Sequence, residues 1–304
     1  MDNNTLYQQA VAHSIKHDFH IKFSADLNNL KSNSFTLSQI EIDSFLPDTP
    51  TETGFVHNSD IPTTSISLLA YLHALNLYPV VYEGENDGQL IRHVVPRKGL
   101  EKQISSYGSN ETFYPHVDNP DLRLRSENLQ QSIKTPSPDT LTLLCLRQHE
   151  GVATSILLLN DILAFLSNEE KLLLQDPVFS VNRPASFKGN YSSSNLPLLI
   201  QESDNSYISR FDYHNLSTQH SPEHICALDK LKQISTDKSI WKSFYLQPGQ
   251  AVTFDNQKTL HTRNGFQPLF NGKDRWLLRV FGLYQKPSDC CLVTPDCKHH
   301  LKTS

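Results

Sequence analysis

The chain has 304 residues, of which 38% are hydrophobic and 19% are charged, and its formal net charge is −5 at pH 7. This length and hydrophobic content allow one large domain, while the acidic balance argues against the cationic surface of a nucleic-acid-binding protein. A polar N-terminus, the lack of a membrane-length apolar run and five cysteines, an odd number, argue against a membrane-spanning or disulfide-held secreted protein. We therefore expect a soluble protein of the cytoplasm, with neither membrane nor nucleic acid as a partner.

The N-terminal part, residues 1–77, is expected to contain helices. Residues 5–17 have a helical pattern, and residues 63–77 place Ile66 and Leu69 near one apolar stripe. The hydrophobic period changes at the end of this part, which marks the beginning of a strand-rich region.

Two strand pairs are expected next. Residues 78–82 and 89–95 are β-rich and flank an Asn-Asp-Gly turn signal. Residues 141–147 and 152–159 form the second pair, around a His-Glu-Gly turn. Both pairs have the short strand lengths of an antiparallel sheet.

Helix signals return in the second half of the chain. A capping box at residues 167–170 predicts a helix through Leu174, and a Ser-Pro pair at residues 221–222 opens another helix. Residues 183–206 are rich in Ser, Asn and Pro and are expected to form a long loop.

The late strands define the fold class that the sequence predicts. A Pro-Gly turn precedes a strand at residues 250–255, and residues 275–284 are the last clear strand. Many short strands with added helices favour a mainly β fold with a double-stranded β-helix (jelly roll) core over a doubly wound parallel sheet. We expect one domain over residues 1–304, with the core at 78–284 and a C-terminal tail at 285–304. This tail contains Cys and His residues without zinc-ligand spacing, and it is expected to be mobile.

Three residues could hold a metal ion. On a strand, His116 and Asp118 would point the same way, with Cα atoms roughly 6–7 Å apart. With 14 histidines and 32 acidic residues, chance alone gives about 1.5 such pairs, so a surface hydrogen bond is the alternative interpretation of the pair. Together with His261, the pair would supply two imidazoles and one carboxylate, which suits a non-haem Fe(II) site with open positions and also serves zinc.

The last strand has two arginines on one face. Arg275 and Arg279 share that face with apolar residues, while the opposite face reads as core packing. A guanidinium grips a carboxylate through two parallel hydrogen bonds, and a separation of roughly 13 Å would let the two arginines hold two different anions. An exposed edge strand with surface ion pairs is the alternative interpretation.

In order and spacing, residues 78–284 resemble the clavaminate synthase-like branch of the Fe(II)/2-oxoglutarate-dependent oxygenases, in the TauD/TfdA-type superfamily. The similarity is greatest to bacterial hydroxylases of free arginine, asparagine and lysine. The resemblance implies a jelly-roll oxygenase with His116, Asp118 and His261 as its iron ligands.

The resemblance also implies a co-substrate and a substrate. Arg275 falls on the arginine that binds the distal carboxylate of 2-oxoglutarate, and Thr154 on a threonine that helps to hold it. Arg279 matches the position that receives the carboxylate of the amino-acid substrate, and Asp212 a position that can meet its side chain. The implied reaction is hydroxylation of a small L-amino acid, basic or polar, with Fe(II), 2-oxoglutarate and O2.

Two departures from the family leave alternatives open. Asp118 stands where close relatives often have Glu, and residues 119–139 are longer than in those relatives, as a lid or as a plain surface loop. A peptide or carrier-bound substrate, a cupin-like metal-binding protein and a zinc hydrolase are the other functions that the sequence allows. The oligomeric state is unknown from the sequence.

Overall fold

The computed structural model describes residues 2–101, 112–127, 135–183 and 192–303. The helices of these residues are α1 (Asn3–Lys16), α2 (Phe19–Lys22), α3 (Ser24–Asn33), α4 (Pro62–Ala74), α5 (Leu159–Leu163), α6 (Asn168–Leu173) and α7 (Pro222–Ser235). The strands are β1 (Phe35–Gln39), β2 (Tyr78–Tyr82), β3 (Arg92–Val94), β4 (Phe113–His116), β5 (Thr140–Arg147), β6 (Thr154–Leu158), β7 (Phe179–Asn182), β8 (Ser192–Leu196), β9 (Leu199–Gln201), β10 (Tyr207–Ser209), β11 (Leu216–Ser217), β12 (Lys242–Phe244), β13 (Gln250–Asp255), β14 (Thr259–Arg263), β15 (Trp276–Leu283) and β16 (His300–Leu301). The prediction of a mainly β chain with added helices is confirmed.

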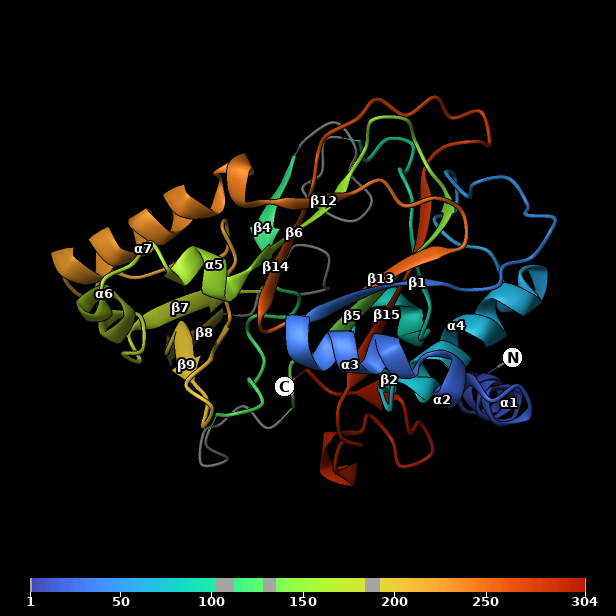
Figure 1. Ribbon diagram of the computed structural model, residues 1–304, viewed down its shortest axis with the longest axis horizontal. Helices are drawn as coiled ribbons and strands as arrows, with labels where there is room; N and C mark the ends of the chain where they lie inside the picture. The colour runs from blue at the N-terminus through green and yellow to red at the C-terminus, as the bar shows by residue number, and fades with distance from the viewer. Residues whose placement is uncertain (1, 102–111, 128–134, 184–191, 304) are drawn as a thin grey trace.

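Two sheets form the centre of the molecule. The larger one has the strand order β1-β13-β5-β15-β2-β16, with β3 also paired to β15, and the smaller one has the order β12-β6-β14-β4. In Figure 1, α1–α4 gather on one side of these sheets, and α5–α7 with the small strands β7–β9 form the other side. The pocket described below lies between the two sheets.

Strand β15 is central to the larger sheet because both of its faces are apolar. Trp276, Leu278 and Val280 pack into the core that α1 and α4 cover. Leu277 and Phe281 point the other way, into the core between the sheets. The alternation that the sequence predicted for this strand is therefore confirmed, and it sends Arg275 and Arg279 toward the space between the sheets.

The helix predictions hold, with small shifts at the ends. In α4, Pro62 occupies the first turn, where its missing N–H costs no hydrogen bond. The predicted capping box of α6 is present, with reciprocal hydrogen bonds between Ser167 and Glu170. Ser221 caps α7 by accepting a hydrogen bond from the backbone N–H of His224. Within the part of the chain that the structure describes, no helix is both long and apolar enough to span a membrane.

The strands expected on either side of the two turn signals are present, but the prediction that they pair with each other is wrong in both cases. β2 and β3 do not pair with each other; both pair with β15, at Phe281↔Val80 and Arg279↔Arg92. The turn signal instead forms a short 3-10 turn in which Asn86 and Asp87 adopt left-handed φ values of 50° and 48°. β5 and β6 belong to different sheets, because the chain crosses between the sheets after β5.

Two irregular segments are more ordered than expected. The loop prediction for residues 183–206 is wrong where β8 pairs with β7 and β9 with β10, while residues 184–191 lie outside the described residues. The C-terminal residues are not a free tail. β16 pairs in parallel with β2, His299 stacks on Tyr78, and Leu301 is fully buried. Packing against β2 supplies partners that no local sequence signal shows.

The expected lid at residues 119–139 is described at its two ends only, since residues 128–134 lie outside the described residues. At the first end, the buried Glu127 forms an ion pair with Arg210, whose guanidinium also donates to the carbonyl oxygens of Pro120 and Leu122. These contacts hold the segment that follows Asp118 against the rest of the fold.

Candidate active site

The fold brings the three predicted metal ligands together. β14 lies between β4 and β6, and its pairing with β4 sets His261 directly opposite His116, with ring centroids 4.1 Å apart. Asp118 follows the end of β4, and its two carboxylate oxygens lie 3.7 Å from Nε2 of His116 and 3.9 Å from Nε2 of His261. The ligand atoms of the three residues all lie within 4.8 Å of one another, a spacing at which one ion could contact all three.

The protonation of the three groups suits a divalent cation. Nδ1 of His116 lies 2.8 Å from the carbonyl oxygen of Tyr114, which can only accept, so Nδ1 carries the proton and Nε2 presents its lone pair. That Nε2 is buried without a hydrogen-bond partner. Burial and the neighbouring His116 lower the pKa of His261 to about 3, so this imidazole is neutral at pH 7.

The carboxylate supplies the negative charge of the group. Burial favours the protonated form of Asp118, but Arg279 and the two histidines outweigh burial and hold the pKa of Asp118 below its ordinary value. Two neutral imidazoles and one carboxylate are the ligand set of non-haem Fe(II) sites. The donor set that the sequence predicted therefore fits Fe(II), and the orphaned Nε2 of His116 is explained by an ion at this position.

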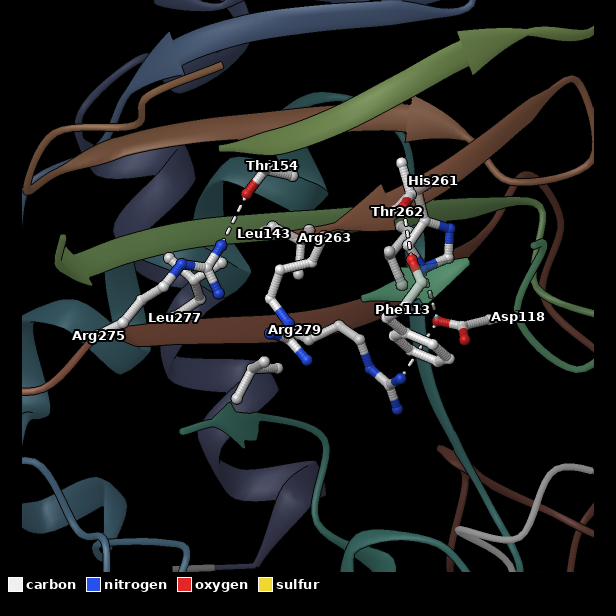
Figure 2. Close-up of a pocket in the computed structure, with 12 residues that line it drawn as sticks. Phe113, Asp118, Leu143, Thr154, His261, Thr262, Arg263, Arg275, Leu277 and Arg279 are labelled. Atoms are coloured by element: carbon white, nitrogen blue, oxygen red, sulfur yellow. Dashed lines mark hydrogen bonds and ion pairs between the residues drawn. The ribbon is translucent and has the colours of Figure 1, made fainter. Parts of the chain in front are cut away.

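A pocket with about 490 Å³ of empty space, partly open to solvent, lies between the sheets beside these ligands. Its walls include apolar side chains from the larger sheet, such as Leu143 and Leu277, and Phe113 from β4. Figure 2 shows that His261 and Asp118 lie at one end of the pocket and that Arg275 and Thr154 lie at the other. Mixed apolar walls with a few converging polar groups are typical of a small-molecule site.

The far end of the pocket has a buried positive charge that suits an anion. Arg275 is buried, and its Nη2 donates a hydrogen bond of 2.9 Å to Oγ1 of Thr154. Burial lowers its pKa to about 10, which leaves the guanidinium charged at pH 7. Its Nε has no hydrogen-bond partner, and no carboxylate of the described residues lies within ion-pair distance of it. A buried cation in this state is stabilised by an anionic ligand.

Arg263, which the sequence analysis missed, lines the same pocket. It stands two residues after His261 on β14, and burial together with the charge of Arg275 lowers its pKa to about 9. The period of two along β14 was the signal that could have placed it on the same face as His261.

Arg279 lies beside the metal ligands. Its Nη1 donates to Oδ2 of Asp118 at 3.1 Å, and its Nη2 forms an ion pair with Glu85, as Figure 2 shows for Asp118. Glu85 is 3% exposed and also contacts Arg92 at 3.4 Å. The sequence analysis missed Glu85, which follows β2 in a turn and belongs to no local motif.

The structure places Asp212 near the ligands through its backbone, which forms a β-bridge with His116. Its carboxylate accepts hydrogen bonds of 2.9 Å from the backbone N–H groups of His214 and Asn215 and from the side chain of Asn215. Asp212 is not among the residues that line the pocket, whereas Thr154, Arg275 and Arg279 are.

Comparison with curated proteins finds amino-acid hydroxylases. The chain is 26% identical over 265 residues to enduracididine beta-hydroxylase of Streptomyces hygroscopicus, covering 78% of this chain and 72% of the relative. It is 25% identical to L-lysine 3-hydroxylase of Catenulispora acidiphila over 76% of this chain and 62% of the relative. It is 27% identical to L-asparagine oxygenase of Streptomyces coelicolor over 82% and 71%.

Solved structures show the same fold. An asparagine oxygenase in complex with Fe(II), 2S,3S-3-hydroxyasparagine and succinate superposes with a TM-score of 0.82 at 22% identity, over 98% of this chain and 89% of the other. The non-haem iron oxygenase OrfP in complex with Fe and alpha-ketoglutaric acid gives a TM-score of 0.77 at 21% identity, over 98% and 90%. The family model described as taurine catabolism dioxygenase TauD, TfdA family matches residues 60–281, which is most of the chain, and the chain therefore belongs to this family of dioxygenases.

Proposed function

We propose that this protein is a non-haem iron, 2-oxoglutarate-dependent dioxygenase that hydroxylates an unactivated carbon of a small L-amino acid and releases succinate and CO2. One observation carries the proposal. A single pocket has Asp118 and His261, whose ligand atoms converge with that of His116, at one end and the buried guanidinium of Arg275, without a carboxylate partner among the described residues, at the other. The relatives named as hydroxylases of enduracididine, lysine and asparagine support the substrate class.

Each end of the pocket has its own task. His116 and His261 would hold Fe(II) through neutral imidazole nitrogens, and Asp118 would add one negative charge. Bound iron, together with 2-oxoglutarate, supplies the activation of O2 by which one oxygen atom enters a C–H bond and the other enters succinate. Arg275, steadied by Thr154, would grip the distal carboxylate of 2-oxoglutarate. The apolar walls at Leu143 and Leu277 would limit the access of water to the reacting atoms.

The substrate would bind between Arg279 and Glu85. These two side chains present a cation and an anion side by side, which is the complement of the carboxylate and ammonium groups of an amino acid. Binding would replace their direct ion pair by one contact from each group to the substrate. Arg279 thus keeps its expected role of binding the carboxylate of the substrate, and Glu85 would bind the ammonium group.

Replacing Glu85 with Gln is expected to raise the KM for the amino acid about 10–100-fold, because a hydrogen bond to a charged group contributes about 1.5–3 kcal/mol. The KM for 2-oxoglutarate should change little, and steady-state kinetics with each substrate varied in turn measure both. Glu83→Gln, an exposed acid two residues away, is the matched control. Equal rises in the two KM values would contradict the assignment.

We also propose that Asp212 favours a basic side chain on the substrate. Asp212→Asn keeps the Oδ1 that accepts from the backbone N–H groups of His214 and Asn215 but removes the charge. It is expected to weaken binding of arginine or lysine about 2–5-fold, the loss of one charge contact of about 0.5–1 kcal/mol, and to leave neutral amino acids unaffected. Competition binding with arginine and its neutral analogue citrulline distinguishes the two. The same loss for both would assign Asp212 to the turn alone.

The proposed function is tested by incubating the iron-loaded protein with 2-oxoglutarate, O2 and pooled L-amino acids. Succinate that depends on the amino acids, with one pool member gaining a single oxygen atom by mass spectrometry, is the expected result. If succinate does not exceed the level of a control without amino acids, the substrate is instead a peptide or carrier-bound residue. If no succinate forms under any condition, a cupin-like metal-binding protein is favoured. If the protein is active without O2, a zinc hydrolase is favoured.

Three finer points belong to this proposal. We infer that the two main sheets form a double-stranded β-helix core within one oxygenase domain over residues 1–304. The segment 119–139 remains the proposed lid over the pocket. The cytoplasm remains the proposed location, since its reducing conditions keep free cysteines as thiols and iron as Fe(II).

A further inference from the structure

The turn between β13 and β14 connects the larger sheet to the strand that carries His261. Within it, Oδ1 of Asp255 accepts hydrogen bonds of 3.0 Å from the backbone N–H groups of both Gln257 and Lys258. Asn256 and Gln257 are both fully buried. The turn is therefore a fixed platform, and its two amide side chains are directed into the protein.

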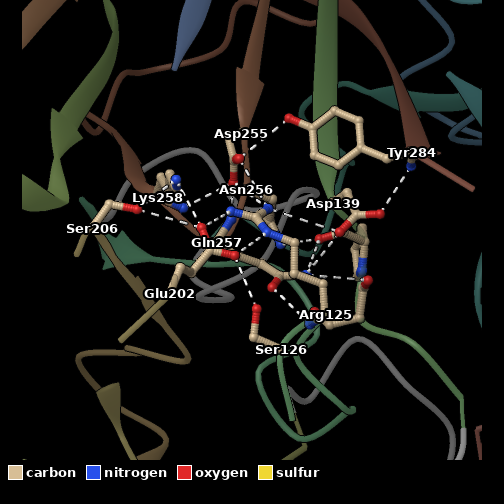
Figure 3. A network of polar contacts seen from close by, with 12 residues as sticks. Arg125, Ser126, Asp139, Glu202, Ser206, Asp255, Asn256, Gln257, Lys258 and Tyr284 are labelled. Carbon is tan, nitrogen blue, oxygen red and sulfur yellow. Dashed lines mark hydrogen bonds and ion pairs between the residues drawn. The ribbon is translucent and has the colours of Figure 1, made fainter. Parts of the chain in front are cut away.

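The side chain of Asn256 holds the backbone of Asp118 from both sides of the residue. Its Oδ1 accepts a hydrogen bond of 2.9 Å from the N–H of Asp118, and its Nδ2 donates to the carbonyl oxygen of Asp118 at 3.0 Å. The same Nδ2 donates to the carbonyl oxygen of Pro138 at 3.1 Å. Figure 3 shows Asn256 among the polar side chains that gather under this turn.

Asparagine fits this position for a chemical reason. The site offers one backbone donor and two backbone acceptors, and a primary amide has one acceptor oxygen and two N–H donors. An aspartate of the same shape would accept from Asp118 but repel both carbonyl oxygens. An apolar residue would leave the N–H of Asp118 unpaired and would remove one hydrogen bond from each of the two carbonyl oxygens.

Asp118 needs such a support because the sheet does not provide one. β4 ends at His116, and the next N–H, that of Val117, bonds to the carbonyl oxygen of Phe211. Asn119 then adopts a left-handed conformation with φ of 54°, which turns the chain away from the strand. Asn256 bonds both the N–H and the carbonyl oxygen of Asp118, and it lies five residues before His261 on the same turn and strand, so it links the positions of the two ligands.

We propose that Asn256 is a positioning residue that fixes the Asp118 carboxylate relative to His261 and so sets the affinity and geometry of the metal site. This inference rests on the proposed metal site. It adds a residue that contacts neither metal nor substrate and acts through the backbone of one ligand. Outer residues that orient metal ligands typically change metal affinity by ~10–100-fold when replaced.

Gln257 provides a matched control within the same turn. Its Oε1 accepts from the N–H of Arg125 at 3.1 Å, and its Nε2 donates to the carbonyl oxygen of Pro138 and to Oδ1 of Asp139, each at 3.3 Å. These bonds tie down the segment after Asp118, as Figure 3 shows, but none of them reaches a metal ligand. Both amides are fully buried, so alanine at either position removes a comparable set of buried hydrogen bonds.

The experiment titrates Co(II), a redox-stable probe, into the full-length wild type, Asn256→Ala, Asn256→Asp and Gln257→Ala. Affinity and the intensity and position of the Co(II) absorption bands are measured below the melting temperature of each protein. Both Asn256 variants are expected to bind Co(II) ~10–100-fold more weakly, with altered bands. Gln257→Ala is expected to lose comparable thermal stability while keeping the wild-type affinity and spectrum.

One outcome would contradict the positioning role of Asn256, and a different outcome would contradict the metal site itself. If the Asn256 and Gln257 variants bind Co(II) alike, the positioning role of Asn256 is wrong and the turn serves only stability. If the wild type binds Co(II) no better than Asp118→Ala does, the metal site itself is wrong, and with it the proposed function. The Asn256→Asp variant, which preserves shape, keeps the test valid if alanine at this position prevents folding.

Discussion

Replacing Asp118 with alanine is expected to abolish metal binding and hydroxylation together. The variant loses the only carboxylate of the donor group and also the partner of Nη1 of Arg279 at 3.1 Å. The two imidazoles would then lie beside the guanidinium of Arg279, which keeps its ion pair with Glu85, with no carboxylate left in the donor group to attract a divalent cation. If metal binding loses a free energy comparable to the about 3–5 kcal/mol that breaking a buried charge pair costs, metal affinity falls roughly 10²–10⁴-fold.

Metal content after dialysis and succinate formation are the two measurements for this variant. Asp118→Glu is the control, because it keeps the carboxylate on an arm that is one methylene longer, and we expect it to retain metal with reduced turnover. Asp118→Asn keeps the shape and removes the charge, and it should resemble the alanine variant. Turnover that survives in Asp118→Ala would end the assignment of this residue as an iron ligand.

The parts of the site that could be predicted from the sequence are those encoded by local pattern. Arg275 and Arg279 were placed on one face of β15 by a period of two, and the structure has that alternation because both faces of the strand pack against apolar layers. His116 and Asp118 are two residues apart, so any extended conformation brings them near each other. Their link to His261 came from resemblance, since no local rule predicts which distant strand will lie beside β4.

The parts that were missed depend on contacts across the sheets. The role proposed for Glu85 depends on β2 and β15 being neighbours, and the role proposed for Asn256 depends on the β13–β14 turn lying beside Asp118. An Asn-Asp-Gly signal encodes a reversal of the chain but not its partner strand, which is why β2 and β3 were wrongly expected to pair. β16 is similarly set by burial of Leu301 against β2, a preference visible only when the sheet exists.

Replacing Arg275 with methionine is expected to raise the KM for 2-oxoglutarate about 10²–10⁴-fold, because two charge-assisted hydrogen bonds of about 1.5–3 kcal/mol each are lost. Thr154→Val removes a hydrogen bond that orients Arg275 but no proposed contact to the co-substrate carboxylate, so it should raise the same KM only about 5-fold. Arg147→Met is the matched control. That arginine bonds Oγ1 of Thr49 and the carbonyl oxygen of Leu46 and does not line the pocket, so the KM for 2-oxoglutarate should not change.

Although Arg275→Met is expected to weaken co-substrate binding, it should make the protein without co-substrate more stable. Burial depresses the pKa of Arg275 to about 10, so the folded protein without co-substrate holds a charge that burial disfavours. Arg275→Met should therefore melt at a higher temperature than the wild type when 2-oxoglutarate is absent, and it should lose the stabilisation that 2-oxoglutarate gives the wild type. If Arg275 served only packing, Arg275→Met would instead lower the melting temperature of the protein, both with and without 2-oxoglutarate. If Arg275→Met keeps the wild-type KM while Arg263→Met raises it, the co-substrate carboxylate belongs on Arg263, the other buried guanidinium of this pocket.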